Sequence, residues 1–523
     1  MTLTGEHLID GTWHASVKRF VARNPSTGDV LQPDFYEASE KDVDAALAAA
    51  SRAFDASSSL DPRWPAQLLE AVGDRIMDLG DALLERAEQE TALPRARLTM
   101  ERGRTVSQLK MFAQVVRDGA WLDATIDTAD PGRTPVPKPD VRRVMRPRGP
   151  AVVFGASNFP FAFSVLGGDT ASALAAGNPV IVKGHPSHPG TSELFARAML
   201  AAIDSLDLPR GLFALLQGTT HDLGGALVKH PATAAVGFTG SQRAGRALFD
   251  LAAARPKPVP VYAEMGSLNP LVVMPGAIRD RGDAIAKALA GSVLLGGGQF
   301  CTKPGVVIVG RDSDAFVEKL STEIAASAPV TMLNAPLREN FIKRVEAWSR
   351  IKDVRARIKS TGSGFAAVTP SLFETSAGTF VRERELREEA FGPAALVVRC
   401  ETASEMELVI AVIGGSLTGT VHVGTGDDAR PILDALAAVS GRVVIDGYPT
   451  GVEVCHAMVH SGPYPATTDA ATTSVGSAAI RRFARMVAYQ NTPDALLPPA
   501  LRNANPMKVE RTVNGRRTSD AIR

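Results

Sequence analysis

The sequence has few cysteines, almost no net charge and no long uncharged apolar run. Its three cysteines, Cys301, Cys400 and Cys455, cannot form a disulfide framework and fit a reducing compartment. The 57 Lys and Arg nearly balance the 56 Asp and Glu, which argues against a nucleic-acid binder and against a disordered chain. No run reaches the ~18 residues of a membrane span, and the N-terminus lacks the apolar stretch of a signal peptide. We therefore expect a cytoplasmic globular protein that binds neither nucleic acid nor membrane.

Several familiar catalytic motifs are also missing. The sequence contains no P-loop, no Gly-x-Ser-x-Gly elbow and no GxGxxG dinucleotide fingerprint. Two histidine pairs, His185 with His188 and His456 with His460, have spacings that a metal could use, but no Glu follows His456 as a metalloprotease helix needs. We expect no metal site. The 45% of hydrophobic residues still allows a large core, and a chain of this size suggests an enzyme.

Helix and strand patterns alternate along most of the chain. The spacing predicts a helix over 40–57, with Ser39 as its N-cap, and a long helical segment over about 64–92. After residue 150, short apolar strands alternate with helices such as the one predicted over 281–295. This rhythm indicates parallel, doubly wound α/β sheets.

The alternation of strand and helix patterns is interrupted and then resumes, which suggests two α/β units. It resumes after Asn269, so one boundary is expected near 262–269. Residues 126–148, rich in proline and charge, predict an extended excursion, and the polar tail after about Asn491 predicts a surface extension.

Cys301 is the first candidate functional residue. It follows the glycine run 296–298, which lets the backbone bend closely around the sulfur. A thiolate is a strong nucleophile toward a carbonyl carbon, although a lone cytosolic cysteine is more often a small core residue. Cys400 ends a predicted strand and is interpreted as structural, while the role of Cys455 stays open.

Two polar residues stand where predicted strands end. Glu264 closes an apolar strand before Gly266, at the sheet edge where α/β proteins place their sites. An apolar setting would raise its pKa toward that of a general base, although such a Glu could also cap a helix or form an ion pair. Asn158, in a turn after a strand, could donate its amide to an oxyanion or simply form an Asx-turn.

Two further segments could bind a ribose or a phosphate. Lys183 ends a buried strand and could reach such a ligand, or could extend into solvent. Gly240 and Ser241 join a strand to a helix, where backbone N–H groups are available to a phosphate.

In this order, these residues and the segment EEAFGP at 388–393 resemble the aldehyde dehydrogenase superfamily. The resemblance extends from GTW at 11–13 to about Pro499. It implies an α/β fold with two doubly wound domains and a bridging β arm that includes a late strand near 480–490, assembled as a homodimer or homotetramer. The implied divisions are a cofactor domain of 1–125 and 149–262, a catalytic domain of 263–460, and an arm and extension of 126–148 and 461–523.

The resemblance also implies a reaction. Cys301 would attack an aldehyde carbon, and Asn158 with the Cys301 backbone N–H would stabilise the oxyanion. After hydride transfer to a nicotinamide, Glu264 would activate the water that hydrolyses the thioester to a carboxylate. A catalytically silent homologue and a CoA-acylating enzyme are the alternatives; the intact set of three residues argues against the first, and the retained Glu264 against the second.

The same resemblance implies the cofactor contacts. Lys183 and Glu389 would hold the two riboses, Gly240 and Ser241 would lie at the pyrophosphate, and Phe391 would pack near the nicotinamide.

The cofactor preference follows from one departure. Pro186 stands third from Lys183, where NAD-preferring members often carry Glu. A Glu there repels a 2′-phosphate, whereas Lys183 with His185 or His188 nearby can tolerate one. We predict that NADP is preferred and that NAD can also serve.

The substrate prediction rests on four unusual motifs. They resemble the α-ketoglutaric semialdehyde (2,5-dioxovalerate) dehydrogenase branch, which implies oxidation of 2,5-dioxopentanoate to 2-oxoglutarate. A related likeness to NADP-linked fatty aldehyde dehydrogenases of luminous bacteria implies a long apolar aldehyde instead. The motifs are GHPSHPGTSE (184–193), EMGSLNP (264–270), GGGQFCTKPG (296–305) and PTGVEVCHAMVHSGPYPATTD (449–469).

Aromatic residues could line an entrance tunnel for either aldehyde, or could be ordinary core. They are Phe159, Phe163, Phe300 and Tyr464.

Overall fold

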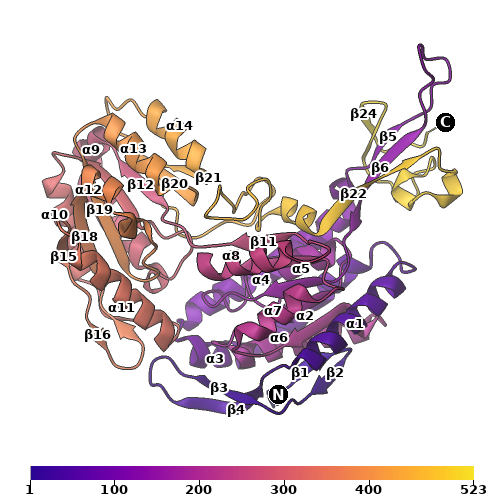
Figure 1. The fold of residues 1–523 in the computed structure, drawn as a ribbon, viewed down its shortest axis with the longest axis horizontal. Helices are drawn as coiled ribbons and strands as arrows, with labels where there is room; N and C mark the ends of the chain where they lie inside the picture. The colour runs from indigo at the N-terminus through magenta and orange to yellow at the C-terminus, as the bar shows by residue number, and fades with distance from the viewer. Residues whose placement is uncertain (1, 523) are drawn as a thin grey trace.

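Two sheet-based lobes and a projecting arm make up the computed structural model, which describes residues 2–522 (Figure 1). The first lobe is built on a seven-stranded sheet in the order β11-β10-β7-β8-β9-β1-β2. The hairpin β1 (His7–Ile9) and β2 (Thr12–His14) joins it antiparallel to β9. The five parallel strands are β7 (Ala151–Phe154), β8 (Val180–Lys183), β9 (Phe213–Leu216), β10 (Ala235–Thr239) and β11 (Val261–Glu264).

Helices cover both faces of this sheet. Successive residues of β8 show this, because Val180 and Val182 belong to one hydrophobic cluster and Ile181 to another. The helices are α1 (Glu40–Ser57), α2 (Trp64–Asp78), α3 (Gly80–Thr91), α4 (Arg95–Asp118), α5 (Gly168–Ala175), α6 (Pro189–Ser205), α7 (His221–Lys229) and α8 (Gln242–Ala253).

The helix predictions for this lobe were partly correct. α1 has the predicted bounds, and Ser39 caps it in a capping box with Asp42. The long segment predicted over 64–92 is instead two helices, because Gly80 takes a left-handed φ of 56° and starts a new one. The 24-residue helix α4 was not predicted.

The second lobe contains another seven-stranded sheet, in the order β15-β18-β19-β13-β12-β20-β21. Only β15 (Arg355–Ile358) is antiparallel to its neighbour. The parallel strands are β12 (Pro270–Val273), β13 (Val306–Gly310), β18 (Ser371–Ser376), β19 (Ala394–Cys400), β20 (Ser416–His422) and β21 (Ser440–Ile445).

Helices flank this sheet as well, so two α/β units of the expected class are present. The helix predicted from 281 begins earlier, at Pro275, and is irregular at Arg281. The helices are α9 (Pro275–Leu294), α10 (Asp314–Ala325), α11 (Ala335–Arg350), α12 (Ala377–Arg382), α13 (Ala403–Ile413) and α14 (Arg430–Val439).

A five-stranded sheet forms the arm. β6 (Val141–Pro147) and β22 (Ala484–Gln490), which are far apart in sequence, pair along their whole length. The tail predicted as a surface extension instead supplies two strands and part of a small core around Ile126 and Leu501 (Figure 1). The other arm strands are β5 (Thr125–Asp127), β23 (Arg511–Val513) and β24 (Arg516–Thr518).

Residues 446–483, here called the strap, connect β21 to β22. In Figure 1 this segment crosses between the lobes and ends in the short helix η5 (Ser477–Phe483). Its middle pairs with the end of β11: the Met265 N–H donates to the Ala466 carbonyl at 2.7 Å, and the Thr468 N–H donates to the Ala263 carbonyl at 3.2 Å. The strap therefore lies directly against the edge of the first sheet.

The remaining strands form two small sheets. They are β3 (Arg19–Arg23) with β4 (Val30–Tyr36), and β14 (Val330–Thr331) with β16 (Gly362–Ser363) and β17 (Ala367–Val368). Among residues 2–522, no helix combines the length and apolar character needed to cross a membrane.

Candidate active site

A cavity of about 510 Å³ lies where β10 and β11 end, beneath the strap. The carboxyl ends of parallel strands share one sheet edge, which explains why Asn158, Gly240 and Glu264 meet there. Cys301 and Glu389 reach the cavity from loops of the second lobe, before β13 and β19. Most of the predicted site residues line it: Asn158, Phe159, Phe163, Gly240, Ser241, Glu264, Cys301, Glu389 and Phe391. His460 of the strap also lines this cavity, which we call the active-site cavity.

The glycine run before Cys301 bends as its composition suggests. Gly296, Gly297 and Gly298 all take left-handed φ values, of 59°, 67° and 67°. A Cβ on Gly298 would lie 2.2 Å from the Gly392 carbonyl oxygen. Glycine is therefore required there for the Cys301 loop to pack against the 388–393 segment.

Asn269, from the unusual EMGSLNP motif, fixes the Cys301 loop from the other side. Its Nδ2 donates to the carbonyls of Cys301 at 2.7 Å and Lys303 at 2.9 Å. Its Oδ1 accepts from the backbone N–H of Thr418 at 3.1 Å and from the Ser267 hydroxyl at 2.8 Å. The motif that departs from the common family pattern thus anchors the cysteine to the second sheet.

The electrostatics around Cys301 keep its thiol protonated. Burial, with the carboxylates of Glu264 and Glu389, raises the pKa of Cys301 to about 12. Its Sγ lies 3.5 Å from Nε2 of His460. Burial and the surrounding arginines lower the pKa of His460 to about 3, so the imidazole is neutral. The described residues contain no group of three or more His, Cys, Asp or Glu that could hold a metal ion.

Glu264 is anchored through one carboxylate oxygen. The side chain is 3% exposed, and its Oε1 accepts from Nη2 of Arg482 at 2.7 Å. Nη1 of Arg482 donates to Oδ1 of Asp169 at 3.1 Å. Oε2 of Glu264 has no hydrogen-bond partner within residues 2–522. Burial raises the pKa of Glu264 to about 8, with Arg482 opposing that rise and Asp169 adding to it.

Arg482 and Asp169 were not found from the sequence. They are 313 residues apart, on η5 and α5, and no local motif marks either one. An arginine in a short helix and an aspartate in the first turn of another helix give no sequence signal of a site. Their pairing depends on the path of the strap.

Asn158 is buried, and both its side-chain amide and its backbone carbonyl form hydrogen bonds. Its Nδ2 donates to the Gln299 carbonyl at 2.9 Å, which leaves one amide N–H. Its own backbone carbonyl accepts from Nη2 of Arg97 at 2.6 Å. The Gln299 side chain in turn accepts from the Leu333 N–H at 2.9 Å. This network fixes the amide beside the Cys301 loop.

Glu389 and the start of α8 form the far side of the cavity. Ser241 is the N-cap of α8, where backbone N–H groups of the first turn are available. Oε1 of Glu389 has no partner among the described residues. A Cβ on Gly266 would lie 2.4 Å from Oε2 of Glu389, so the glycine leaves room for that carboxylate beside the cavity. Buried Lys303 holds the segment behind it through the Ala390 carbonyl at 3.1 Å.

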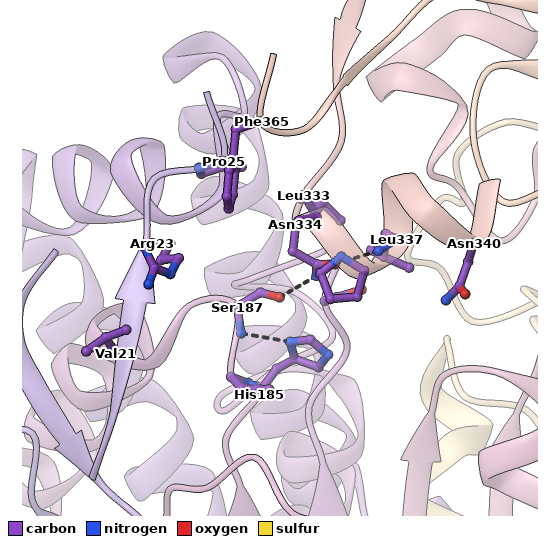
Figure 2. A pocket seen from close by; sticks show the side chains of 14 residues that line it. Val21, Arg23, Pro25, His185, Ser187, Leu333, Asn334, Leu337, Asn340 and Phe365 are labelled. Carbon is purple, nitrogen blue, oxygen red and sulfur yellow. Dashed lines mark hydrogen bonds between the residues drawn. The ribbon is translucent and has the colours of Figure 1, made fainter. Parts of the chain in front are cut away.

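Lys183 lies outside the active-site cavity, at the end of β8. Burial lowers its pKa to about 8. The residues that follow it, including His185 and Pro186, line a neighbouring cavity of about 570 Å³. In Figure 2, Ser187 and Asn334 lie next to each other in the wall of this cavity, where the Asn334 amide donates to the Ser187 hydroxyl at 2.7 Å.

The two histidines after Lys183 differ in position. His188 is fully buried, with Nε2 2.9 Å from the Ala156 carbonyl, so it does not reach the 570 Å³ cavity. Burial lowers the pKa of both His185 and His188, well below the usual range for His185. Neither ring therefore supplies a positive charge at neutral pH, which corrects the expectation that they would assist Lys183.

Three of the four predicted tunnel aromatics form one cluster. The ring centroid of Phe159 lies 5.2 Å from that of Phe163 and 5.1 Å from that of Phe300. Tyr464 is not part of it: it is 53% exposed and does not line the active-site cavity. The strap turns its neighbour Pro465 toward the cavity and leaves Tyr464 on the surface.

Comparison with known families agrees with this architecture. The aldehyde dehydrogenase family model matches residues 13–457, and the chain belongs to that family. As a member, it is an oxidoreductase that acts on aldehydes.

Similar proteins match over nearly the whole chain. Alpha-ketoglutaric semialdehyde dehydrogenase 2 of Azospirillum brasilense is 48% identical over 527 residues, with 99% of this chain and 100% of that protein covered. Alpha-ketoglutaric semialdehyde dehydrogenase of Acinetobacter baylyi is 40% identical, with 98% of each covered. A Thermus 1-pyrroline-5-carboxylate dehydrogenase with bound NAD superposes with a TM-score of 0.80 over 93% of this chain and 92% of that chain, at 20% identity, and so shares the fold.

Proposed function

We propose that this protein oxidises 2,5-dioxopentanoate to 2-oxoglutarate, with NADP preferred over NAD. The observation that carries the proposal is the shared cavity of Cys301, Glu264 and Asn158. The substrate is inferred from the two full-length relatives, both of which are named as alpha-ketoglutaric semialdehyde dehydrogenases.

The first step is attack of Cys301 on the aldehyde carbon. A thiol with a pKa of about 12 must lose its proton as it attacks. Glu264, with a pKa of about 8, accepts that proton more readily than His460, whose pKa is about 3. His460 instead orients the sulfur from 3.5 Å. The free amide N–H of Asn158 and the backbone N–H of Cys301 stabilise the oxyanion that forms.

The cavity residues fit a nicotinamide dinucleotide. The free N–H groups at Ser241 suit a pyrophosphate, and the unpartnered Oε1 of Glu389 suits a ribose hydroxyl. Phe391 lines the same cavity, and Lys183 lies at the neighbouring strand end. When bound, the nicotinamide accepts the hydride that the Cys301 adduct loses, which leaves a thioester on the sulfur.

Hydrolysis of the thioester is assigned to Glu264. Arg482 holds one carboxylate oxygen, so the unpartnered Oε2 remains to take a proton from water. A pKa of about 8 lets this carboxyl both accept and release protons near neutral pH.

The NADP preference is supported by the charge around the cavity that follows Lys183. No carboxylate is among the described residues that line it, while Arg23 is (Figure 2). A 2′-phosphate near this cavity would therefore meet attraction rather than repulsion. Initial rates at matched NADP and NAD concentrations test this, and a strong preference for NAD would overturn it.

We also propose a homodimer or homotetramer. β22 is an outer strand of the arm sheet, and its free edge suits pairing with a second copy. Light scattering after size-exclusion chromatography checks this, and a monomer would contradict it.

The function is tested by reduced-cofactor formation on a panel of aldehydes. It consists of 2,5-dioxopentanoate, succinic semialdehyde, and short and long alkanals, each with wild type and Cys301→Ala. We expect 2,5-dioxopentanoate to have the highest kcat/KM and Cys301→Ala to abolish it. Preference for long alkanals would reassign the substrate, turnover of nothing would favour a silent homologue, and a need for CoA would replace hydrolysis by acyl transfer.

A further inference from the structure

A second cavity adjoins the active site on the side of α4. It has a volume of about 420 Å³ and lies between α4 and the strap. Its wall includes Arg97, Arg104, Phe159, Phe300 and Glu453. Phe159 also lines the active-site cavity, so the two spaces meet at that ring.

Arg104 brings buried, unpaired N–H donors to this cavity. Its Nη1 and Nη2 are both buried, and neither has a hydrogen-bond partner within residues 2–522. A guanidinium is always charged and carries five N–H donors. Leaving such donors buried and unpaired is costly, so a native structure that retains them needs an explanation such as a ligand. Burial lowers the pKa of Arg104, and the carboxylates of Glu101 and Glu453 oppose that fall.

The nearby charged residues form hydrogen bonds with groups other than Arg104. Arg97 donates to the Asn158 carbonyl, and its guanidinium carbon lies 5.0 Å from the Phe159 ring centroid. Glu101 also lines this cavity: its Oε1 accepts from the Phe161 N–H at 2.8 Å, and its Oε2 has no hydrogen-bond partner within residues 2–522. Glu453 is exposed at the rim, where it accepts from its neighbour's N–H. Among the described residues, neither glutamate forms an ion pair with Arg104 within 4.0 Å. Both favour its charge from a longer distance, and neither satisfies its Nη donors.

A short series of contacts connects Arg104 to the nucleophile. Its guanidinium carbon lies 5.1 Å from the Phe163 ring centroid, and that ring lies 5.9 Å from the His460 ring. His460 is the 3.5 Å partner of Cys301. The charge of Arg104 acts on the pKa of His460, and Cys301 acts on that of Arg104, so all three lie within one electrostatic neighbourhood.

We propose that Arg104 binds the carboxylate of the substrate at the end opposite the aldehyde. In 2,5-dioxopentanoate, four carbon–carbon bonds separate the two groups, which places them roughly 5 Å apart. A carboxylate can accept from both Nη groups of Arg104 at once, a geometry that lysine cannot reproduce. Arg104 thereby selects short aldehydes with a terminal carboxylate. This inference rests on the proposed function and deepens it.

Three substrates of equal carbon number separate the carboxylate from the rest of the molecule. They are 2,5-dioxopentanoate, 5-oxopentanoate, which lacks the ketone, and pentanal, which lacks the carboxylate. In Arg104→Met, we expect kcat/KM for both acids to fall about 100-fold, mainly through KM, and kcat/KM for pentanal to change far less. Arg104→Lys should restore part of the loss for the acids.

Two further variants control for charge. Lys110→Met removes an exposed cation from the same helix and should leave all three substrates unaffected. Glu453→Gln removes a competing carboxylate from the cavity and should lower KM for the acids, in the direction opposite to Arg104→Met.

A binding measurement tests the same idea without turnover. The product 2-oxoglutarate should raise the thermal unfolding midpoint of wild type and not that of Arg104→Met. Equal loss on the acids and pentanal, or unchanged stabilisation by 2-oxoglutarate, would overturn the role of Arg104. If wild type instead oxidises none of the acids, the proposed function fails, which is a distinct result.

Discussion

The two walls of the active site are built in different ways. One wall, the sheet wall, consists of the ends of β7 and β11 with the loops that follow them, and of the glycine loop between α9 and β13. It carries Asn158, Glu264 and Cys301. The other side, here called the arginine wall, consists of α4 and the strap. It carries Arg104, which lines the adjoining 420 Å³ cavity, and Arg482, which donates to Glu264. Under the proposed mechanism, the sheet wall would supply the reacting groups, whereas the arginine wall would adjust their pKa values and bind the far end of the substrate.

We therefore expect substitutions of the reacting groups and substitutions of the arginines to have different effects. Loss of a reacting group removes a step for every aldehyde. Loss of an arginine changes a pKa or a binding contact, and so depends on pH or on the substrate. Substitutions on each wall therefore test the comparison.

Removal of the nucleophile should have the largest effect. Cys301→Ala is expected to lower kcat/KM by about 10⁵-fold or more for acids and alkanals alike, because no other group on the sheet wall can form the thioester. Steady-state rates across the panel measure this. Cys455→Ala, on the strap, is the matched control and should retain activity. Residual turnover that differs between substrates would mean that the arginine wall contributes to the chemistry.

Removal of the base should separate two steps. Glu264→Gln is expected to lower steady-state turnover by about 10²- to 10⁴-fold, because water is no longer deprotonated. If the thioester still forms, rapid mixing should show a burst of about one reduced cofactor per active site, followed by the slow phase. Loss of the burst together with turnover would place Glu264 in the attack step as well, where it takes the thiol proton.

The arginine wall should act through pH. With a Glu264 pKa of about 8, wild-type turnover should rise as pH increases through that value, because the active carboxylate is the deprotonated form. Arg482→Met removes the favourable cation and should move the midpoint to higher pH, with about a 10-fold loss at neutral pH. Asp169→Asn removes a like charge and should move it to lower pH.

The two substitutions are expected to shift the midpoint of the pH profile in opposite directions, which a general loss of stability would not do. The charged groups that act on Glu264 are Arg482 and Asp169, and Glu264 in turn acts on Cys301. Arg481→Met, at the exposed neighbouring position on η5, should leave the midpoint in place. Equal losses of activity without any shift of the midpoint would reduce Arg482 and Asp169 to a structural role.

The sheet wall could be predicted from sequence because its signals are local. Glu264 ends an apolar strand, and the glycine run before Cys301 predicts a tight bend. The parallel α/β rhythm then places the ends of β7 and β11 at one edge, where Asn158 and Glu264 lie. Cys301 reaches the same cavity from the loop before β13 of the second sheet. The aldehyde dehydrogenase resemblance added the order of the residues.

The arginine wall could not be predicted in this way. Arg482 meets Glu264 across 218 residues, through a strap with little regular structure. Arg104 sits in α4, a helix whose buried face carries polar residues such as Gln108, so its apolar periodicity is weak. Tyr464 was misplaced for the same reason, because nothing in an irregular segment fixes which side chains face inward.

The smallest expected effect lies at the far end of the sheet wall, where Pro186 follows Lys183. If strand-end residues alone decide the cofactor, one carboxylate there should suffice to alter the choice. Pro186→Glu is expected to lower the NADP-to-NAD ratio of kcat/KM by about 10-fold, because a carboxylate near a 2′-phosphate repels it. Pro186→Ala controls for loss of the proline ring. A ratio unchanged by Glu would show that Arg23 and Lys183 outweigh position 186, and that cofactor choice, like the substrate contact, depends on cations from outside the strand end.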